Sequence, residues 1–217
     1  MGSAGFIIAG VLVTVGNIFV TWLDLSRPDV AQGRIGSQII MFQVVVLMIT
    51  FGWWASLMGA AAVHRSIAVA GEAWARMGFY LMIIGVGLWT LGMVLDISYS
   101  AMIANWLAAP EAGKEAAHNL LTTFFPPGGG LGRGLFPMTV MSTWLAYSFL
   151  GIGMIRSDIY PRRLGWLGSI LGILGVLLGM VITFTGREAV YMFFTVLAFL
   201  TILWLLMVGI WVARRAW

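Results

Sequence analysis

Residues 164–185 read LGWLGSILGILGVLLGMVITFT, and this stretch decides the fold class. It carries no formal charge over 22 residues, whereas a helix needs about 20 apolar residues to cross a ~30 Å hydrocarbon layer. Gly165, Gly168, Gly172, Gly175 and Gly179 recur at steps of three and four, which places them on one helical face. Small residues let another helix approach closely, so this face predicts packing within a membrane bundle. A dimer face or a channel wall is the alternative.

Five further stretches are similarly long and uncharged: 4–23, 39–63, 77–95, 135–155 and 189–213. Alternating β-barrel periodicity is absent, so helices are the remaining way to satisfy a spanning backbone. The sequence therefore predicts an all-α protein, a polytopic transmembrane six-helix bundle. We expect residues 1–217 to form a single integral membrane domain.

Composition excludes other classes of protein. Hydrophobic residues make up 61% of the chain and charged residues 9%, against about 25% charged in soluble domains. So few charges cannot cover a water-facing surface. The absence of cysteine excludes disulfides and thiolate metal sites. The net charge of +4 comes from basic residues near span ends, which indicates lipid headgroups as partners and no nucleic acid.

Basic residues also predict the orientation in the membrane. Six spans put both termini on one side, together with Arg65, Arg76, Arg156, Arg162, Arg163, Arg214 and Arg215. The opposite side has Arg27, Arg34, Lys114, Arg133 and Arg187. Seven against five favours cytoplasmic termini. The expected location is a bacterial-type inner (plasma) membrane.

One connection, residues 96–134, is predicted to be a long Pro/Gly-rich loop between the third and fourth spans. The third helix can continue past Asp96 through Ile103, and 108–121 can form a short surface helix. The sequence then reads FFPPGGGLGRG from Phe124 to Gly134. Two prolines end any helix, and glycines adopt backbone shapes that other residues resist. This segment is either a flexible connector or a re-entrant plug.

Polar residues at membrane depth are costly and therefore point to function. Asn17, Gln43, Asp96 and Arg133 are the candidate ligand-binding residues. Asn17 and Gln43 are explained by hydrogen bonds between helices, and Asp96 by an interfacial ion pair with a basic residue such as Arg133. Alternatively, Asp96, Asn17 and Gln43 line the polar path of a small transporter or channel.

Two histidines raise a redox alternative, in which His64 or His118 binds haem or quinone. His64 ends the second span, whereas His118 lies in the long connection on the other side, roughly 30 Å away. One haem therefore cannot join them. No catalytic residues, metal site or cofactor are otherwise predicted. The leading hypothesis is a non-enzymatic homo-oligomer or accessory subunit of a membrane complex that binds lipid or a hydrophobic ligand.

The turn before residues 164–185 carries a family resemblance. Residues 149–168 read FLGIGMIRSDIYPRRLGWLG: a helix ends in Arg-Ser, a short turn carries Pro-Arg, and a Leu/Gly-rich helix follows. This pattern resembles the DUF4386-type family of uncharacterised six-span bacterial membrane proteins, mainly over residues 145–185. The resemblance implies a six-helix membrane bundle and assigns no activity.

Overall fold

The computed structural model describes residues 2–23, 28–67, 70–124, 130–186 and 190–215, and helices dominate them. Their bounds are α1 (Gly2–Leu23), α2 (Pro28–Ser37), α3 (Ile39–Ser66), α4 (Glu72–Ala108), α5 (Glu111–Phe124), α6 (Gly130–Ile155), α7 (Arg162–Thr185) and α8 (Tyr191–Arg215). Five of them, α3, α4, α6, α7 and α8, are long and apolar enough to cross a membrane. The apolar stretch of α1, Ala4–Val20, is shorter. The predicted all-helical, multi-pass membrane fold is confirmed at this level.

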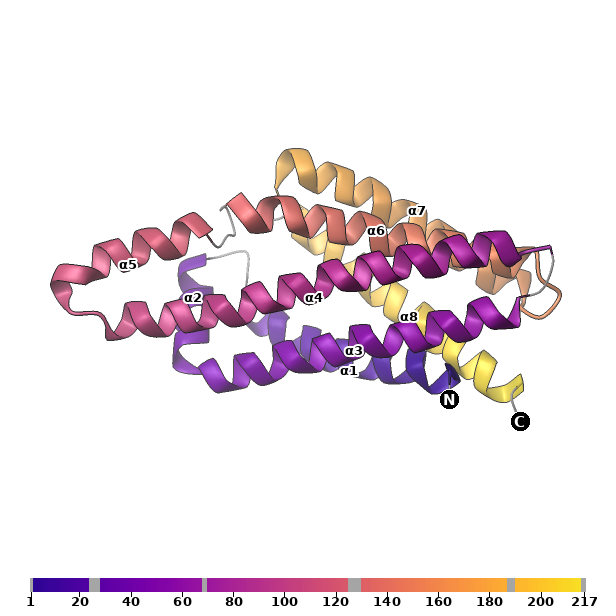
Figure 1. Ribbon diagram of the computed structural model, residues 1–217, viewed down its shortest axis with the longest axis horizontal. Helices are drawn as coiled ribbons and strands as arrows, with labels where there is room; N and C mark the ends of the chain where they lie inside the picture. Colours follow the sequence, from indigo (N-terminus) through magenta and orange to yellow (C-terminus); the bar gives the residue numbers. More distant parts are fainter. Residues whose placement is uncertain (1, 24–27, 68–69, 125–129, 187–189, 216–217) are drawn as a thin grey trace.

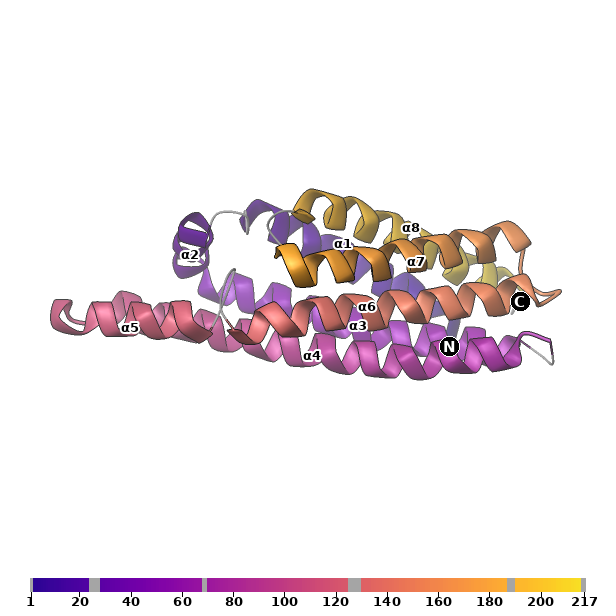
Figure 2. The same ribbon diagram turned by 90° about the horizontal axis from the view of Figure 1, so that it is seen from above.

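The long helices form a ring in sequence order (Figures 1 and 2). Along it α1 packs on α3, α3 on α4, α4 on α6, α6 on α7, α7 on α8, and α8 on α1. Each helix of the ring turns an apolar face outward: Val15 on α1, Phe51 on α3, Ile84 on α4, Met138 on α6, Ile173 on α7 and Phe199 on α8 are about half exposed. Exposed apolar side chains around a whole bundle fit a hydrocarbon solvent.

The two ends of the bundle differ. The start of α1 and the end of α8 lie at the same end as the α3–α4 and α6–α7 connections (Figure 1). We call it the arginine end, because it gathers Arg65, Arg76, Arg156, Arg162, Arg163, Arg214 and Arg215 at helix ends. The opposite end carries α2 and α5.

The third predicted span is much longer than expected. Helix α4 has 37 residues, about 55 Å of helix against a ~30 Å hydrocarbon layer. It continues through Asp96 because only isolated polar residues interrupt an otherwise apolar, proline-free run. The predicted long loop, residues 96–134, is helical over most of its described part, since α5 and the start of α6 also fall there. Residues 125–129, the centre of the suggested connector or plug, lie outside the described residues.

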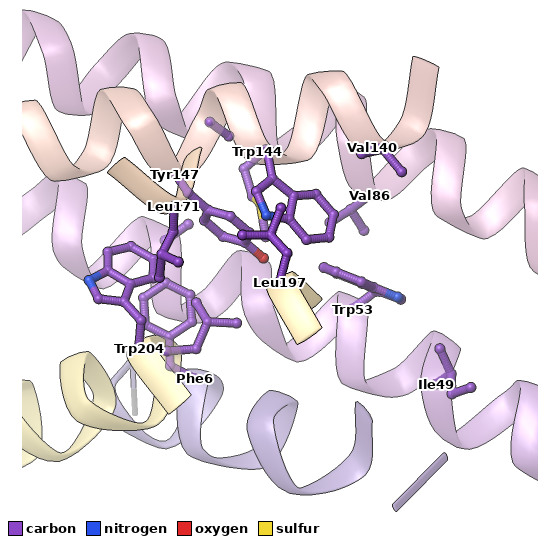
Figure 3. Packing of buried hydrophobic residues seen from close by; sticks show 14 of the residues in the cluster. Phe6, Ile49, Trp53, Val86, Val140, Trp144, Tyr147, Leu171, Leu197 and Trp204 are labelled. Atoms are coloured by element: carbon purple, nitrogen blue, oxygen red, sulfur yellow. The ribbon is translucent and has the colours of Figure 1, made fainter. Parts of the chain in front are cut away.

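Aromatic side chains fill the centre of the ring (Figure 3). Trp53 stacks on Trp89, with ring centroids 4.8 Å apart, and so joins α3 to α4. Trp144 of α6 meets Tyr147 edge to face at 6.1 Å, and Tyr147 meets Trp204 of α8 at 5.5 Å. Such geometries add to the free energy that burial alone contributes. The core is therefore a continuous aromatic layer between helices.

The indole nitrogens in this core donate hydrogen bonds between elements. Trp89 donates to the Thr143 hydroxyl at 3.1 Å, and Trp144 to the Thr201 hydroxyl at 3.2 Å. Trp204 donates to the backbone carbonyl of Leu164 at 2.9 Å. A buried N–H without an acceptor is costly, so these bonds let tryptophan occupy the middle of the bundle.

The glycines of α7 lie against α6 and α8. A Cβ on Gly165 would come 2.8 Å from the carbonyl oxygen of Gly151, and one on Gly172 would come 2.5 Å from the backbone nitrogen of Ser148. A Cβ on Gly175 would lie 1.9 Å from the Trp144 ring. The close approach of α6 and α7 therefore requires glycine at these positions.

We predict that Gly175→Ala lowers the thermal stability of the detergent-solubilised protein, at a cost of about 1–3 kcal/mol for overpacking. The Trp144 ring is 2% exposed and has no space to move into. The matched control is Gly87→Ala on α4, because a Cβ there meets nothing within 4 Å. Equal melting temperatures of the two variants would contradict this account of the α6–α7 contact.

Candidate functional site

A cluster of polar side chains lies where α2, α3 and α4 meet. Gln43 of α3 donates from its amide nitrogen to the hydroxyl of Ser100 on α4 at 3.0 Å. Ser100 is fully buried and also donates to the carbonyl of Ile97 at 2.7 Å. Gln32 of α2 hydrogen-bonds Tyr99, and both side chains are less than 10% exposed. The cluster thus ties three helices together through satisfied polar groups.

The distance of this cluster from the arginine end compares with the thickness of a hydrocarbon layer. Asp96 follows Arg76, at the arginine end, by 20 residues of α4, which is about 30 Å along the axis and equals the thickness of the hydrocarbon layer. Asp96 is partly buried and lies close enough to Tyr99 to act on it electrostatically. We call the α4 segment beyond Asp96 and helix α5, residues 97–124, the arm. Its α4 part packs beside α2, and the tip where α4 meets α5 extends past the other helices (Figure 2).

The other two candidate ligand-binding residues lie on different helices. Asn17 of α1 donates to the carbonyl of Val13, one turn earlier, at 2.8 Å. In the described part of the chain, α1 and α4 both pack on α3 but not on each other, so α3 separates Asn17 from Asp96. Arg133 lies in the first turns of α6, and its side chain is outside the described residues. Gln43 therefore lies beside the part of α4 that carries Asp96, whereas Asn17 lies elsewhere in the bundle.

This arrangement supplies amide, hydroxyl and carboxylate oxygens. Such groups can hold a water molecule, a proton or a hard cation. Among the described residues no group of three or more His, Cys, Asp or Glu side chains could hold a metal ion. The Gln43–Ser100 and Gln32–Tyr99 bonds join different helices, so the cluster fastens α2 and α3 to α4.

The two histidines lie in separate places. His64 is in the last turn of α3 and stacks on Phe79 at 5.6 Å, and its buried Nε2 has no hydrogen-bond partner among the described residues. His118 is on α5 of the arm and meets Trp106 at 5.3 Å. The end of α3 and helix α5 lie at opposite ends of the molecule (Figure 1). A single ligand cannot contact both imidazoles.

Two buried tyrosines differ in how their hydroxyls are satisfied. Tyr147 is fully buried, and its oxygen points into the core toward Leu197 (Figure 3) without a hydrogen-bond partner in the described chain. Tyr160, in the α6–α7 turn, lies 2.6 Å from the hydroxyl of Ser66 at the end of α3. Burial raises the pKa of Tyr160 above its usual value, and this hydrogen bond offsets part of the rise.

Sequence reasoning missed the tryptophans of the core. Trp53, Trp89, Trp144 and Trp204 were given no role from the sequence, yet they lie well inside helices and are the centre of the packing. A usable signal was available: threonines at mid-span, such as Thr143 and Thr201, accept from two of these indoles. Mid-span tryptophan and threonine in one sequence predict hydrogen-bonded pairs between helices.

Comparison of the chain with protein-family models, with curated proteins and with solved structures finds no match. The resemblance of residues 145–185 to the DUF4386-type family stays a prediction.

We predict that the Gln43–Ser100 bond contributes measurably to stability. In a double-mutant cycle of Gln43→Leu and Ser100→Ala, the coupling free energy in denaturant unfolding should be about 0.6 kcal/mol and not above ~1.7. The reason is that each single variant leaves the other polar group at the membrane edge without this partner. Strictly additive effects would show that the two side chains act independently.

We further predict opposite effects for two conservative tyrosine variants. Tyr147→Phe should raise stability by about 1 kcal/mol, because it removes a buried hydroxyl that lacks a partner. Tyr160→Phe should lower it by about 1 kcal/mol, because Ser66 loses its bond. Thermal unfolding of both variants beside wild type provides the measurement. A loss of stability in Tyr147→Phe would indicate a partner for that hydroxyl, such as an internal water.

Proposed function

We propose that the chain crosses the membrane six times, with α1 as the sixth span, and that both termini are cytoplasmic in a bacterial-type inner membrane. The 22 residues of α1 support this, since they run within the ring between α3 and α8. Its exposed side chains Ile8, Val11, Val15 and Ile18 are apolar. The seven arginines at the end shared by the termini support the orientation.

We further propose that the protein has no enzymatic activity and works as a homo-oligomer or as an accessory subunit of a membrane complex, in contact with lipid. The filled centre of the bundle carries this proposal. Trp53, Trp89, Trp144 and Trp204 are at most partly exposed and occupy the space where a substrate path would otherwise run. A protein whose interior is occupied in this way acts through its outer surface.

The arm provides the surface for assembly. Helix α5 packs on α4 and α6 with Leu121 fully buried, and Leu120 is about half exposed. Leu107, at the end of α4, is also about half exposed. Apolar groups beyond the hydrocarbon layer are favourable only when something covers them. A second copy of the chain or another subunit of the complex would cover them.

The transporter or channel alternative has one observation in its favour. The Gln43–Ser100 bond lies one helical turn from Asp96, so polar groups from α3 and α4 do meet. Against it, Asn17 is on the far side of α3, and the aromatic core lies between this cluster and the arginine end. The haem or quinone alternative depends on His64 or His118 acting separately. Membership of the DUF4386-type family is likewise proposed from the Arg-Ser…Pro-Arg turn.

The proposed role predicts that protein extracted in mild detergent is larger than one chain. Size-exclusion chromatography with light scattering should give a mass, after subtraction of detergent, of at least two chains or of one chain with partner subunits. Leu107→Glu together with Leu120→Glu should shift the complex toward the monomer, because both substitutions put charge on the proposed contact. Asn105→Glu is the control, because Asn105 is exposed and lies two residues before Leu107, on nearly the opposite face of α4. A strict monomer without co-purifying lipid or partner would refute the proposal.

A further inference from the structure

A groove at the arginine end lies between the α6–α7 turn and the start of α7. It has a volume of about 560 Å³. Its walls combine two guanidinium groups, one carboxylate, one indole and two small or aliphatic side chains: Arg156, Arg162, Asp158, Trp166, Ala70 and Ile155. A volume of this size is ordinary for a site that takes a small molecule or a headgroup.

The charged groups of the groove are not paired with one another. The salt bridges found in the described chain, Glu72–Arg76 and Glu111–Lys114, involve none of the three. The guanidinium of Arg156 lies over the Trp74 ring at 5.3 Å, which fixes its position without neutralising it. Two positive charges and one negative charge therefore face the same space.

The turn that carries Asp158 is held rigidly. The indole of Trp211 donates to the carbonyl of Ile159 at 3.2 Å, and Ile159 donates from its backbone nitrogen to the Ser157 hydroxyl at 3.1 Å. Tyr160 is bonded to Ser66, so α3 and α8 both anchor this turn. Asp158 itself is exposed. A fixed backbone with an exposed carboxylate is preorganised to bind a ligand.

The wall opposite the turn is equally fixed. A Cβ on Gly71, next to Ala70, would lie 2.4 Å from the carbonyl oxygen of Gly153, so the α3–α4 connection packs directly on α6. Trp166 follows Arg162 by one helical turn and is 57% exposed. An exposed indole at the end of a membrane helix is typical of the headgroup layer. The groove therefore opens at the level of phospholipid headgroups.

We propose that this groove binds the headgroup of an amine-bearing, zwitterionic phospholipid. The phosphate lies between Arg156 and Arg162, and the ammonium group contacts Asp158. Basic pockets between membrane helices commonly hold lipid phosphates. Asp158 supplies the selectivity, because a carboxylate attracts an ammonium and repels a headgroup that carries only negative charge. The proposal rests on the membrane placement given above but not on assembly.

The test is competitive lipid retention, measured by native mass spectrometry of the full chain released from micelles. The micelles contain equal amounts of short-chain phosphatidylethanolamine, phosphatidylglycerol and phosphatidylcholine. Wild type should retain phosphatidylethanolamine over phosphatidylglycerol by about two- to fivefold, the range for one partly exposed charge contact. Asp158→Asn should abolish or reverse this preference. An unchanged ratio in Asp158→Asn would overturn the proposal.

The arginines are tested with a matched control. Arg156→Gln together with Arg162→Gln should reduce retention of all three lipids by about two- to fivefold for each arginine. Arg163→Gln removes the same charge from a neighbouring residue that does not line the groove, and it should retain lipid like wild type. Arg162→Gln alone is compared with Arg163→Gln, since each removes one charge. Equal loss of lipid in these two variants would show an effect of net charge and would exclude the groove as the site.

A last experiment distinguishes binding of a lipid from binding of a free anion. Inorganic phosphate and glycerophosphoethanolamine, which lacks acyl chains, are added at the lipid concentration. Neither should displace phosphatidylethanolamine, because the acyl chains contribute binding along the apolar helix surfaces. Displacement by inorganic phosphate would show a soluble anion site instead. A protein that is monomeric, without partner subunits, and still selects phosphatidylethanolamine would count against assembly and leave the lipid site intact.

Discussion

The contact between the Trp144 indole and Gly175 determines how the second half of the bundle assembles. Glycine at position 175 leaves room for the indole, and the indole then reaches Thr201 on α8. One side chain therefore sets the spacing of α6, α7 and α8 together. In hydrocarbon, helices gain little from burying apolar surface, so close packing and buried hydrogen bonds supply the attraction. The aromatic layer at the centre is a consequence of that requirement.

Hydroxyl groups in the described residues also satisfy their hydrogen bonds inside the bundle, either within one helix or between two. Thr50, Thr90, Thr139 and Thr183 each return a hydrogen bond to the carbonyl four residues earlier in their own helix. Ser148 instead donates across the α6–α7 contact to the carbonyl of Ser169 at 3.3 Å, while the Ser169 hydroxyl lies 3.4 Å from the carbonyl of Ser148 and 3.1 Å from that of Gly165 in its own helix. A hydroxyl that bonds to its own helix is compatible with lipid on either side. One that bonds across helices adds to their association.

The sequence predicts the apolar helices well, because a membrane demands about 20 uncharged residues per crossing and little else produces such runs. It does not locate the membrane boundary on α4, where an apolar pattern continues past the bilayer into the arm. Trp106 illustrates the difficulty: it resembles an interfacial tryptophan, yet it follows Trp74 by 32 residues, about 48 Å of helix, more than a whole bilayer spans. Helix α2 is missed for the opposite reason, since its ten residues, PDVAQGRIGS, contain no long apolar run.

The candidate site is predictable only in part. Single polar residues such as Gln43 and Asp96 stand out in apolar runs, but their partners do not. Gln43 and Ser100 are 57 positions apart, so their pairing depends on the relative register of α3 and α4. The groove at the arginine end depends on two turns packed side by side. Charge patterns predicted a basic end but not its concave shape or the one carboxylate within it.

The length of α4 has a mechanical consequence. It is a single proline-free helix from the arginine end to the tip of the arm, and kinks in helices usually need proline or a comparable break. A force applied to α5 therefore acts on a rigid lever. Its torque is transmitted along the shaft to Gly78 and Gly85, which touch the α6 backbone and Thr143. A load on α5 would therefore bear on the packing of α4 against α6.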